Sequence, residues 1–416
     1  MLPASPAIDA PGAAVRHDVA IVGGGLVGAS LAIALDEAGI GAALVEATPA
    51  GALPEVFDQR NLSFADATVN ALRNLGILEE LRSPVGSIRR IHISRAGDLG
   101  RVLLRAGDYG REAFGSVVVA RDFGQALEAR LARCRRVVRY RPARFEGLER
   151  DGGDGWRRLR VSADDGERVL AARLVVGADG TRSAVRTALG IAAREHDYAQ
   201  TLFAARVRAA QAPDGTAYER FGPHGPTALL PRGDRHYGAV HGVAADAADA
   251  VAALGDAGFL QRLQRAFGWR VGRFEACGPR TAYPLAGLVA ERVHASRAVL
   301  VGNAAQTLHP IGAQGFNLGL RDALTLAELL QARGVDAIDD GLLAEYAARR
   351  RVDRERTLAF SDGLARLTAN DAGLLRPLRA AGLFLADRLP ALQGGLVGGA
   401  MGYRGDVPAL CRARDA

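Results

Sequence analysis

DVAIVGGGLVG, residues 18–28, is the stretch that decides the fold of this chain. It joins an apolar run of strand length to a glycine cluster, Gly23, Gly25 and Gly28, with the spacing G-x-G-x-x-G. The first glycine permits a tight bend, the second lets the backbone approach a pyrophosphate, and the third lets the next helix pack closely. That helix offers free N–H groups and a positive dipole to phosphates. The stretch predicts a dinucleotide-binding turn, and the alternative is a glycine turn needed only for packing.

The residues after this cluster complete a βαβ unit. Apolar residues recur at helical spacing within residues 29–38, and AALVE, residues 42–46, is typical of a second strand. Glu46 ends that strand, where its carboxylate would accept hydrogen bonds from ribose hydroxyls. An acid at this position suits FAD or NAD and disfavours the phosphorylated ribose of NADP.

RLVVGADG, residues 173–180, is a second junction between a strand and a turn. Asp179 and the glycine after it close the strand, and a helix follows. Two interpretations stay open, because Asp179 is either a cofactor-binding residue or only a turn residue that caps the helix.

The most informative segment is VGNAAQTLHPIGAQGFNLGLRDA, residues 301–323. A strand ends in a turn that displays Asn303, and the loop after it carries Pro310 and Gly312. Gly315 then opens a helix that we expect to begin near Asn317. The N-terminus of such a helix would stabilise negative charge on a bound cofactor.

Between these motifs, residues 201–243 alternate apolar and polar side chains with regular turn signals, which predicts an antiparallel sheet. From residue 322 to about residue 392 the pattern is helical. The parts of one nucleotide-binding domain are therefore far apart in the sequence. We predict an α/β fold: a discontinuous Rossmann-type domain, an inserted mixed or antiparallel β-sheet domain and a C-terminal helical region.

At its three glycine-rich segments the chain resembles the class A flavin aromatic hydroxylases. More narrowly, it is similar to the 2-polyprenyl-6-methoxyphenol hydroxylases of ubiquinone biosynthesis. The supporting stretches are FDQRNLSF (57–64), VVVARDFGQALEARL (117–131), FGWRVGRFEACGPRTAYPLA (267–286) and GNAAQTLHP (302–310). The resemblance runs from about residue 18 to about residue 408. It implies an FAD-binding domain made of residues 18–86, 117–190 and 296–330. A substrate domain of residues 87–116 and 191–295 and a helical region of residues 331–416 complete the chain.

Two positions depart from the broad family, which has Asp and often His where this chain has Asn303 and Gln306. An Asn side chain still hydrogen-bonds a hydroxyl group. The loop reads Gly-Ala-Gln-Gly at residues 312–315, where the branch more often has Ala-Gly-Gln-Gly.

The resemblance also assigns roles to single residues. Arg60 and Arg121 look like the cofactor-contacting arginines, although surface solvation is the default for any one of 53 basic residues. Pro310 resembles the proline beside the reactive face of the flavin. His309 next to it is either a catalytic polar group or a structural loop residue, and His241 is a weaker candidate for facing substrate.

The function implied is hydroxylation of a polyprenylated phenol with O₂, through a C4a-hydroperoxide of FAD that NADPH or NADH has reduced. Two alternatives are another flavin oxidoreductase, such as a halogenase or an isoprenoid reductase, and a non-catalytic lipid-binding or scaffolding subunit. The isolated Trp156 and Trp269 count against a halogenase, which carries a W-x-W motif. Asn303 is the only support for the scaffold.

Composition bears on location and partners. All 53 basic residues are Arg and the net charge is +7, which indicates either compositional bias or attraction to an anionic membrane. Aromatic residues make up only 6% and no basic block is interleaved with them, which disfavours nucleic acid. Three scattered cysteines have no metal spacing. Residues 1–17 are typical of a short lead, not a signal peptide. We expect a cytoplasmic protein, at most peripheral on the inner face of the membrane.

One apolar stripe near the C-terminus has two interpretations. Leu375, Leu378, Gly382, Leu385 and Leu389 recur at helical spacing, and Leu374 and Phe384 broaden the stripe. The helix either packs on the parent domain, a second subunit or a biosynthetic complex, or lies on a membrane that holds the polyprenyl substrate.

Overall fold

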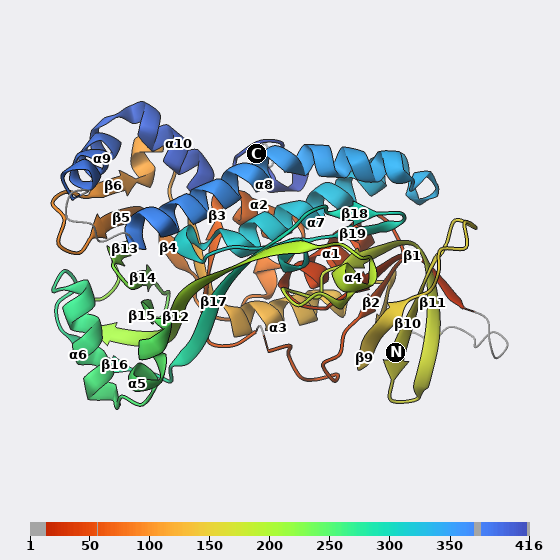
Figure 1. Ribbon diagram of the computed structural model, residues 1–416, viewed down its shortest axis with the longest axis horizontal. Coiled ribbons are helices and arrows are strands. Elements are labelled where there is room, and N and C mark those ends of the chain that lie inside the picture. Colours follow the sequence, from red (N-terminus) through yellow and green to blue (C-terminus); the bar gives the residue numbers. More distant parts are fainter. Residues whose placement is uncertain (1–13, 56, 370–375, 414–416) are drawn as a thin grey trace.

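The computed structural model describes residues 14–55, 57–369 and 376–413 of the chain (Figure 1). Its strands are β1 Val15–Val22, β2 Ala42–Val45, β3 Asn61–Ala65, β4 Gly86–Ile88, β5 Arg90–Arg95, β6 Val102–Arg105, β7 Gly115–Val119, β8 Val137–Tyr140, β9 Ala143–Leu148, β10 Arg157–Ala163, β11 Gly166–Gly177, β12 Ala193–Ala209, β13 Thr216–Gly222, β14 Gly225–Pro231, β15 Tyr237–Ala244, β16 Phe274–Cys277, β17 Thr281–Ala290, β18 His294–Ala295, β19 Ala298–Leu300 and β20 Gln306–Thr307. Its α-helices are α1 Leu26–Glu37, α2 Asp66–Asn74, α3 Ala120–Leu131, α4 Ala184–Ala188, α5 Ala248–Ala252, α6 Asp256–Phe267, α7 Gln314–Arg333, α8 Asp340–Ala369, α9 Arg376–Arg388 and α10 Pro390–Ala400.

The first sheet has the strand order β18-β19-β11-β1-β2-β8. Strands β19, β11, β1, β2 and β8 pair in parallel, while β9 and β10 extend the sheet from β11 by antiparallel pairing. Three segments that are distant in the sequence therefore meet as neighbouring strands. This arrangement confirms the predicted discontinuous Rossmann-type fold.

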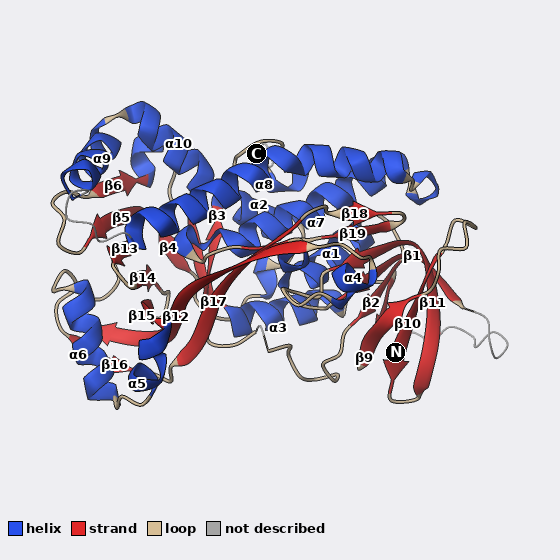
Figure 2. Cartoon of the chain, viewed as in Figure 1, coloured by secondary structure: helices blue, strands red, loops and turns tan. Residues whose placement is uncertain are grey.

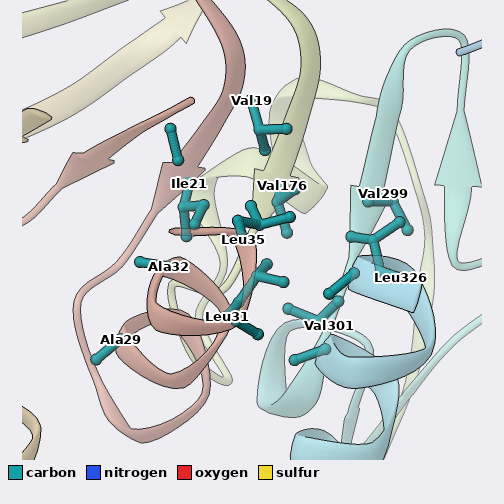
Figure 3. Packing of buried hydrophobic residues seen from close by; sticks show 14 of the residues in the cluster. Val19, Ile21, Ala29, Leu31, Ala32, Leu35, Val176, Val299, Val301 and Leu326 are labelled. Atoms are coloured by element: carbon teal, nitrogen blue, oxygen red, sulfur yellow. The ribbon is translucent and has the colours of Figure 1, made fainter. Parts of the chain in front are cut away.

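The buried parts of the parallel strands are apolar on both faces, as a sheet covered by helices on both sides requires. All four residues of β2 and all three of β19 are buried. Helix α1 packs Leu31 and Leu35 against this sheet, and Leu326 of α7 lies beside Val299 of β19 (Figure 3). Helices α1 and α7 thus share one face of the sheet, which brings their N-termini to the same region.

The second sheet has the order β20-β17-β12-β15-β14-β13-β5-β6, with β16 paired to β12. All its pairings are antiparallel except that of β13 with β5. Most of its strands, drawn in red, lie to the left of the first sheet in Figure 2. The predicted inserted mixed sheet is therefore confirmed. Strands β12 and β17 are long, and they run from beside the first sheet into the second (Figure 1). The exact domain boundaries given above stay a prediction.

The C-terminal region is helical, as predicted. Helix α7 begins at Gln314, three residues before the predicted start. Gly312 and Ala313 have left-handed backbone angles, and the chain returns to helical angles directly after them. Two buried ion pairs lock α7 to α8: Arg321 to Asp353 at 2.6 Å and Arg350 to Asp322 at 2.8 Å. Every helix in the described ranges is too short or too polar to cross a bilayer. No cluster of acidic, His and Cys side chains among the same residues is arranged to hold a metal ion.

Candidate functional site

A cavity of about 1010 Å³ lies between the two sheets. One end is lined by the turn after β1, the ends of β2 and β11, and the 3-10 turn Gly302–Ala304 after β19. The other end is lined by the inner face of the second sheet. Between them lies the loop before α7. One continuous space therefore joins the predicted nucleotide-binding turn to a wall of the inserted sheet.

The glycine turn lies where strand, helix and a neighbouring turn approach most closely. A Cβ on Gly23, whose φ is +106°, would lie 2.6 Å from the carbonyl oxygen of Ala178. A Cβ on Gly28 would lie 1.9 Å from the carbonyl oxygen of Gly23. Gly25 is the N-cap of α1 and lines the cavity with Gly23, while Gly28 is buried behind them. The free N–H groups of a 12-residue helix thus open onto the cavity, as a phosphate group requires.

Glu46 lines the cavity beside this turn, and two backbone groups fix its carboxylate. The Gly24 N–H donates to Oε2 at 2.7 Å and the Thr48 N–H to Oε1 at 2.7 Å. Each carboxylate oxygen has a second lone pair, so both remain able to accept from a hydroxyl group. The geometry fits the predicted ribose contact.

Asp179 combines the two interpretations left open by the sequence. Its carboxylate accepts from the Ser183 hydroxyl at 2.6 Å and from the Val185 N–H at 3.0 Å, which caps α4. The residue also lines the cavity. The buried Arg186 donates to the carbonyl oxygens of Thr181 and Ala304, each at 2.9 Å. This arginine joins the turn of Asp179 to the turn that carries Asn303, so both line the same wall.

The loop before α7 turns sharply, with Gly312 at φ 70° and Ala313 at φ 51°. Pro310, Gly312 and Gly315 line the cavity. Asn317 does not line it: its amide donates to the carbonyl oxygens of Ser63 and Ala313 and accepts from the Ala65 N–H. Asn317 therefore holds the N-terminus of α7 against β3, and a direct cofactor contact stays a prediction.

His309 is 1% exposed and is not among the cavity-lining residues. Its Nδ1 accepts from the Ile311 N–H at 3.2 Å, and its Nε2 lies 3.3 Å from Gln200 Oε1. Burial lowers the pKa of His309 to about 4, so the ring is neutral at physiological pH. These contacts favour the interpretation as a structural loop residue that holds Pro310 in place.

His241 also lies away from the cavity, on the opposite face of β15. Its ring contacts Thr227 at 2.9 Å and accepts from Arg262 of α6 at 3.2 Å. The weaker hypothesis that it faces substrate is therefore wrong, since the cavity-lining residue on this strand is Val240.

Arg60 and Arg121 differ in position. Arg60 lines the cavity, forms a 2.8 Å ion pair with Asp58 and stacks over the ring of Tyr283 at 4.2 Å. The Tyr283 hydroxyl donates to Asp58. Burial opposes ionisation of Asp58, but its hydrogen bonds with Arg60 and Tyr283 prevail and lower its pKa. The Arg121 side chain is exposed and does not line the cavity, so its cofactor contact stays a prediction.

Three further residues in or beside the cavity were not predicted from the sequence: Asp58, Tyr283 and Glu219. Asp58 and Tyr283 lie in the stretches on which the resemblance to the flavin hydroxylases is based. Tyr283 is distant from Arg60 in the sequence, so their contact could not be predicted before the folded structure was known. Glu219 had a local signal. In β13 it shares one face with the buried Ala217 and Phe221, so it is an acid where the alternation calls for an apolar residue.

The residues present fit FAD. Two helix N-termini, of α1 and α7, reach one cavity, and at Gly23 and Gly28 the close packing leaves no room for a Cβ. A flat ring system would lie between the loop before α7 and the second sheet, with the dinucleotide part along the glycine turn.

Comparisons with known proteins agree with this geometry. The model of the FAD binding domain family matches residues 16–361. The ubiquinone hydroxylase UbiL of Rhodospirillum rubrum is 37% identical over 90% of this chain and 87% of its own length. The 3-demethoxyubiquinol 3-hydroxylase of Escherichia coli is 28% identical over 90% of this chain and 96% of its own length. The p-nitrophenol 4-monooxygenase PnpA of Pseudomonas putida, 19% identical, shares the fold with a TM-score of 0.78, over 94% of this chain and 99% of that one.

Proposed function

The chain belongs to the FAD binding domain family, in the branch of the ubiquinone hydroxylases, and from that premise we propose that it hydroxylates the ring of a polyprenylated phenol in ubiquinone biosynthesis. It is an FAD-dependent monooxygenase. The observation that carries the substrate class is the continuous cavity, which joins the glycine turn to an apolar wall.

FAD, when bound, accepts hydride from NADPH or NADH and delivers one oxygen atom of O₂ to the ring. Gly23 and Gly25 would hold its pyrophosphate, Glu46 a ribose, and Asn303 the ribityl chain. The N-terminus of the 20-residue α7 would stabilise negative charge on the reduced ring.

The second sheet supplies the wall against which a phenol ring would lie. Its cavity face consists mainly of apolar side chains: Ile91, Leu202, Ala204, Ala217, Ala228, Leu230 and Val240. Such a wall excludes water from the reacting atoms, which protects a reactive oxygen donor from wasteful hydrolysis. It would also orient a ring without hydrogen-bonding its apolar edge.

The wall continues toward the C-terminal helices, which suits a substrate with an isoprenoid tail. Ile88 and Ala217 line the cavity and belong to a buried cluster that also contains Val397 of α10. Leu383 of α9 packs against this cluster. The opposite side of these helices is exposed: Phe384 by 54%, Leu385 by 47%, Leu389 by 44% and Leu392 by 49%. We call these four residues the apolar ridge. Leu374 and Leu375 of the predicted stripe, and the side chain of Leu378, lie outside the described residues.

We propose that the apolar ridge rests on the membrane in which the tail is dissolved. Leu99, 85% exposed, is at the tip of the loop between β5 and β6. A Cβ added to the next residue, Gly100, would lie 3.5 Å from the Ala380 carbonyl oxygen and 3.7 Å from Leu383 Cβ, so this loop packs on α9. The loop and α9 thus lie next to each other, and each carries exposed apolar side chains. Contact with a membrane would bring this part of the molecule to the substrate.

The decisive experiment measures flavin absorbance, NADPH oxidation and product mass with a panel of prenylated phenols. We expect a yellow protein whose NADPH oxidation yields a product one oxygen atom heavier. Gly25→Val should lose FAD, because a branched side chain at the N-cap of α1 occupies the space of the phosphates. Gly107→Val is the matched control, since the exposed Gly107 has open space around its Cβ position. A colourless wild-type protein would favour the scaffold, and a coloured protein that hydroxylates no phenol would favour another flavin oxidoreductase.

A further inference from the structure

Glu219 is a carboxylate on an apolar wall. It lies on β13, where its partner is Ile93 of β5 on one side and Ala228 of β14 on the other. On the cavity face its neighbours along the strand are Ala217 and Phe221. The other acids that line the cavity, Glu46, Glu146 and Asp179, lie at the nucleotide end. Glu219 is therefore the one acid on the ring-facing wall formed by the described residues.

The surroundings of Glu219 offer it little to bind. A backbone hydrogen bond from Gly312, in the loop before α7, reaches its carboxylate. Within the described ranges no ion pair or side-chain hydrogen bond involves it. Burial raises the pKa of Glu219 to about 7, and the Gly312 hydrogen bond opposes this rise only in part. A carboxylate with so few partners keeps lone pairs free for a ligand in the cavity.

The charged side chains on the elements packed around Glu219 have other partners. On β13 itself, Tyr218 also lines the cavity and its ring packs on Phe267, and the pKa of Arg220 is lowered by burial and by Arg270. On β5, His92 stacks on Tyr218 and Arg95 pairs with Asp98. Strand β14 and the loop Ile311–Ala313 carry no titratable side chain. On α8, which packs on this loop, Asp362 acts on His309.

We propose that Glu219 is a catalytic residue that takes the proton of the phenolic hydroxyl group of the substrate. This inference rests on the proposed function. The O–H bond of the phenol breaks, its electron pair stays on the oxygen, and the proton moves to a carboxylate oxygen of Glu219. The phenolate pushes electron density into the ring, which makes the ring carbon a better nucleophile toward the oxygen that O₂ supplies. The new C–O bond replaces the ring C–H bond, whose hydrogen leaves as a proton when the ring regains aromaticity. The proton held by Glu219 returns to the product phenolate, so Glu219 is regenerated.

The position of Glu219 suits this task in two ways. It lies beside Gly312, so a ring that touches Glu219 also lies against the loop where we place the flavin. The pKa of Glu219, about 7, lies close to neutral pH. A general base is most effective there, because it is largely ionised and still basic enough to take a proton.

The test compares Glu219→Gln with wild type, because Gln keeps an oxygen that accepts from the Gly312 N–H but cannot take a proton. Glu195→Gln, an exposed position on β12, is the matched control. We expect Glu219→Gln to retain FAD and to bind phenols, while its kcat for a weakly acidic prenylphenol falls about a hundredfold or more. With a nitro-substituted phenol, which ionises in water near neutral pH, most of this loss should disappear.

A second readout does not depend on turnover. The ultraviolet difference spectrum of the bound prenylphenol should show phenolate in the wild-type holoenzyme above pH 7 and the neutral phenol in Glu219→Gln. Equal phenolate signals in the two proteins, or a kcat loss that is the same for weakly and strongly acidic phenols, would overturn the proposal. A wild-type protein that ionises the bound phenol without hydroxylating it would contradict the proposed function and leave the role of Glu219 in place.

Discussion

Ala313 holds a left-handed conformation, at φ 51°, directly after the left-handed Gly312. A side chain in this region costs about 1–2 kcal/mol, while glycine adopts it freely. The loop thus stores strain beside the cavity, where a precise backbone path matters more than stability.

Ala313→Gly should relieve this strain. We expect a net gain of about 0.5–1 kcal/mol in the free energy of unfolding, because the extra freedom of glycine in the unfolded chain offsets part of the relief. Urea denaturation measures it, and Ala337→Gly, which is outside this loop, is the comparison. A lower free energy of unfolding in Ala313→Gly than in wild type would contradict the inference that Ala313 is strained.

Glu219 predicts an unusual pH dependence of stability. Its pKa rises from 4.5 to about 7 on folding, so between these values the folded protein binds a proton that the unfolded chain has lost. The free energy of unfolding therefore falls as the pH rises through this window. Glu219→Gln should exceed wild type by about 2 kcal/mol at pH 8, after allowance for solvent in the cavity, with most of the difference gone at pH 5. Thermal melting at the two pH values checks this, and Glu195→Gln should show no such change.

At the scale of single elements, the N-terminus of α7 organises the site. Asn317 fixes it to β3, Gly302 lies under it, and Pro310 leads into it. A Cβ on Gly319 would lie 2.9 Å from the Gly302 Cα, so the turn that carries Asn303 and the helix approach at backbone distance. The position of Asn303 therefore depends on how α7 packs as well as on its own turn.

Helices α9 and α10 carry the prediction about membranes. Asp387 of α9 accepts from the Leu103 N–H at 2.9 Å, so α9 is held on β6 and its apolar ridge stays outward. Wild type should float with anionic liposomes at low salt, and salt should weaken the association. Phe384→Glu with Leu385→Glu should remove it, because two charges replace the side chains that enter the lipid.

Trp269→Glu is the matched control, since Trp269 is 69% exposed but lies beyond α6, at the far side of the second sheet. A wild-type protein that stays with the soluble fraction, or a double variant that floats as well as wild type, would contradict the membrane contact. The tail would then have to be delivered by a partner protein.

At the scale of the whole molecule, the sequence was most informative where a local pattern has one physical solution. The turn at Gly23 and Gly28 has no room for a Cβ, so the spacing of its glycines was enough to predict it. The parallel strands β1, β2, β11 and β19 were predictable because burial on both faces makes their inner parts apolar, whereas β8, which contains Arg139, was not recognised. Glu219, Asp58 and Tyr283 were not recognised, because their meaning depends on strands that meet only in the folded chain. Actual contact of the predicted residues with FAD stays a prediction.

The parallel sheet also determines what a shortened chain can do. Strand β11 lies between β1, which begins at Val15, and β19, which ends at Leu300. A chain that ends before β19 leaves an apolar strand edge open, and such edges pair with other chains. We expect a fragment of residues 14–290 to aggregate on expression, whereas one that ends after α7 at residue 333 should be more soluble. Size-exclusion chromatography of both distinguishes the outcomes, and a monodisperse shorter fragment would contradict the expectation.

The same strand order has a consequence during synthesis on the ribosome. The first βαβ unit emerges early, yet its central sheet is completed only when β19 arrives, and the second helix end of the cavity forms later still, with α7. Pairings so distant along the chain are slow to form. For most of its translation the nascent polypeptide therefore exposes an incomplete sheet, and the protein should depend on chaperones that shield such edges until the last third of the chain is made.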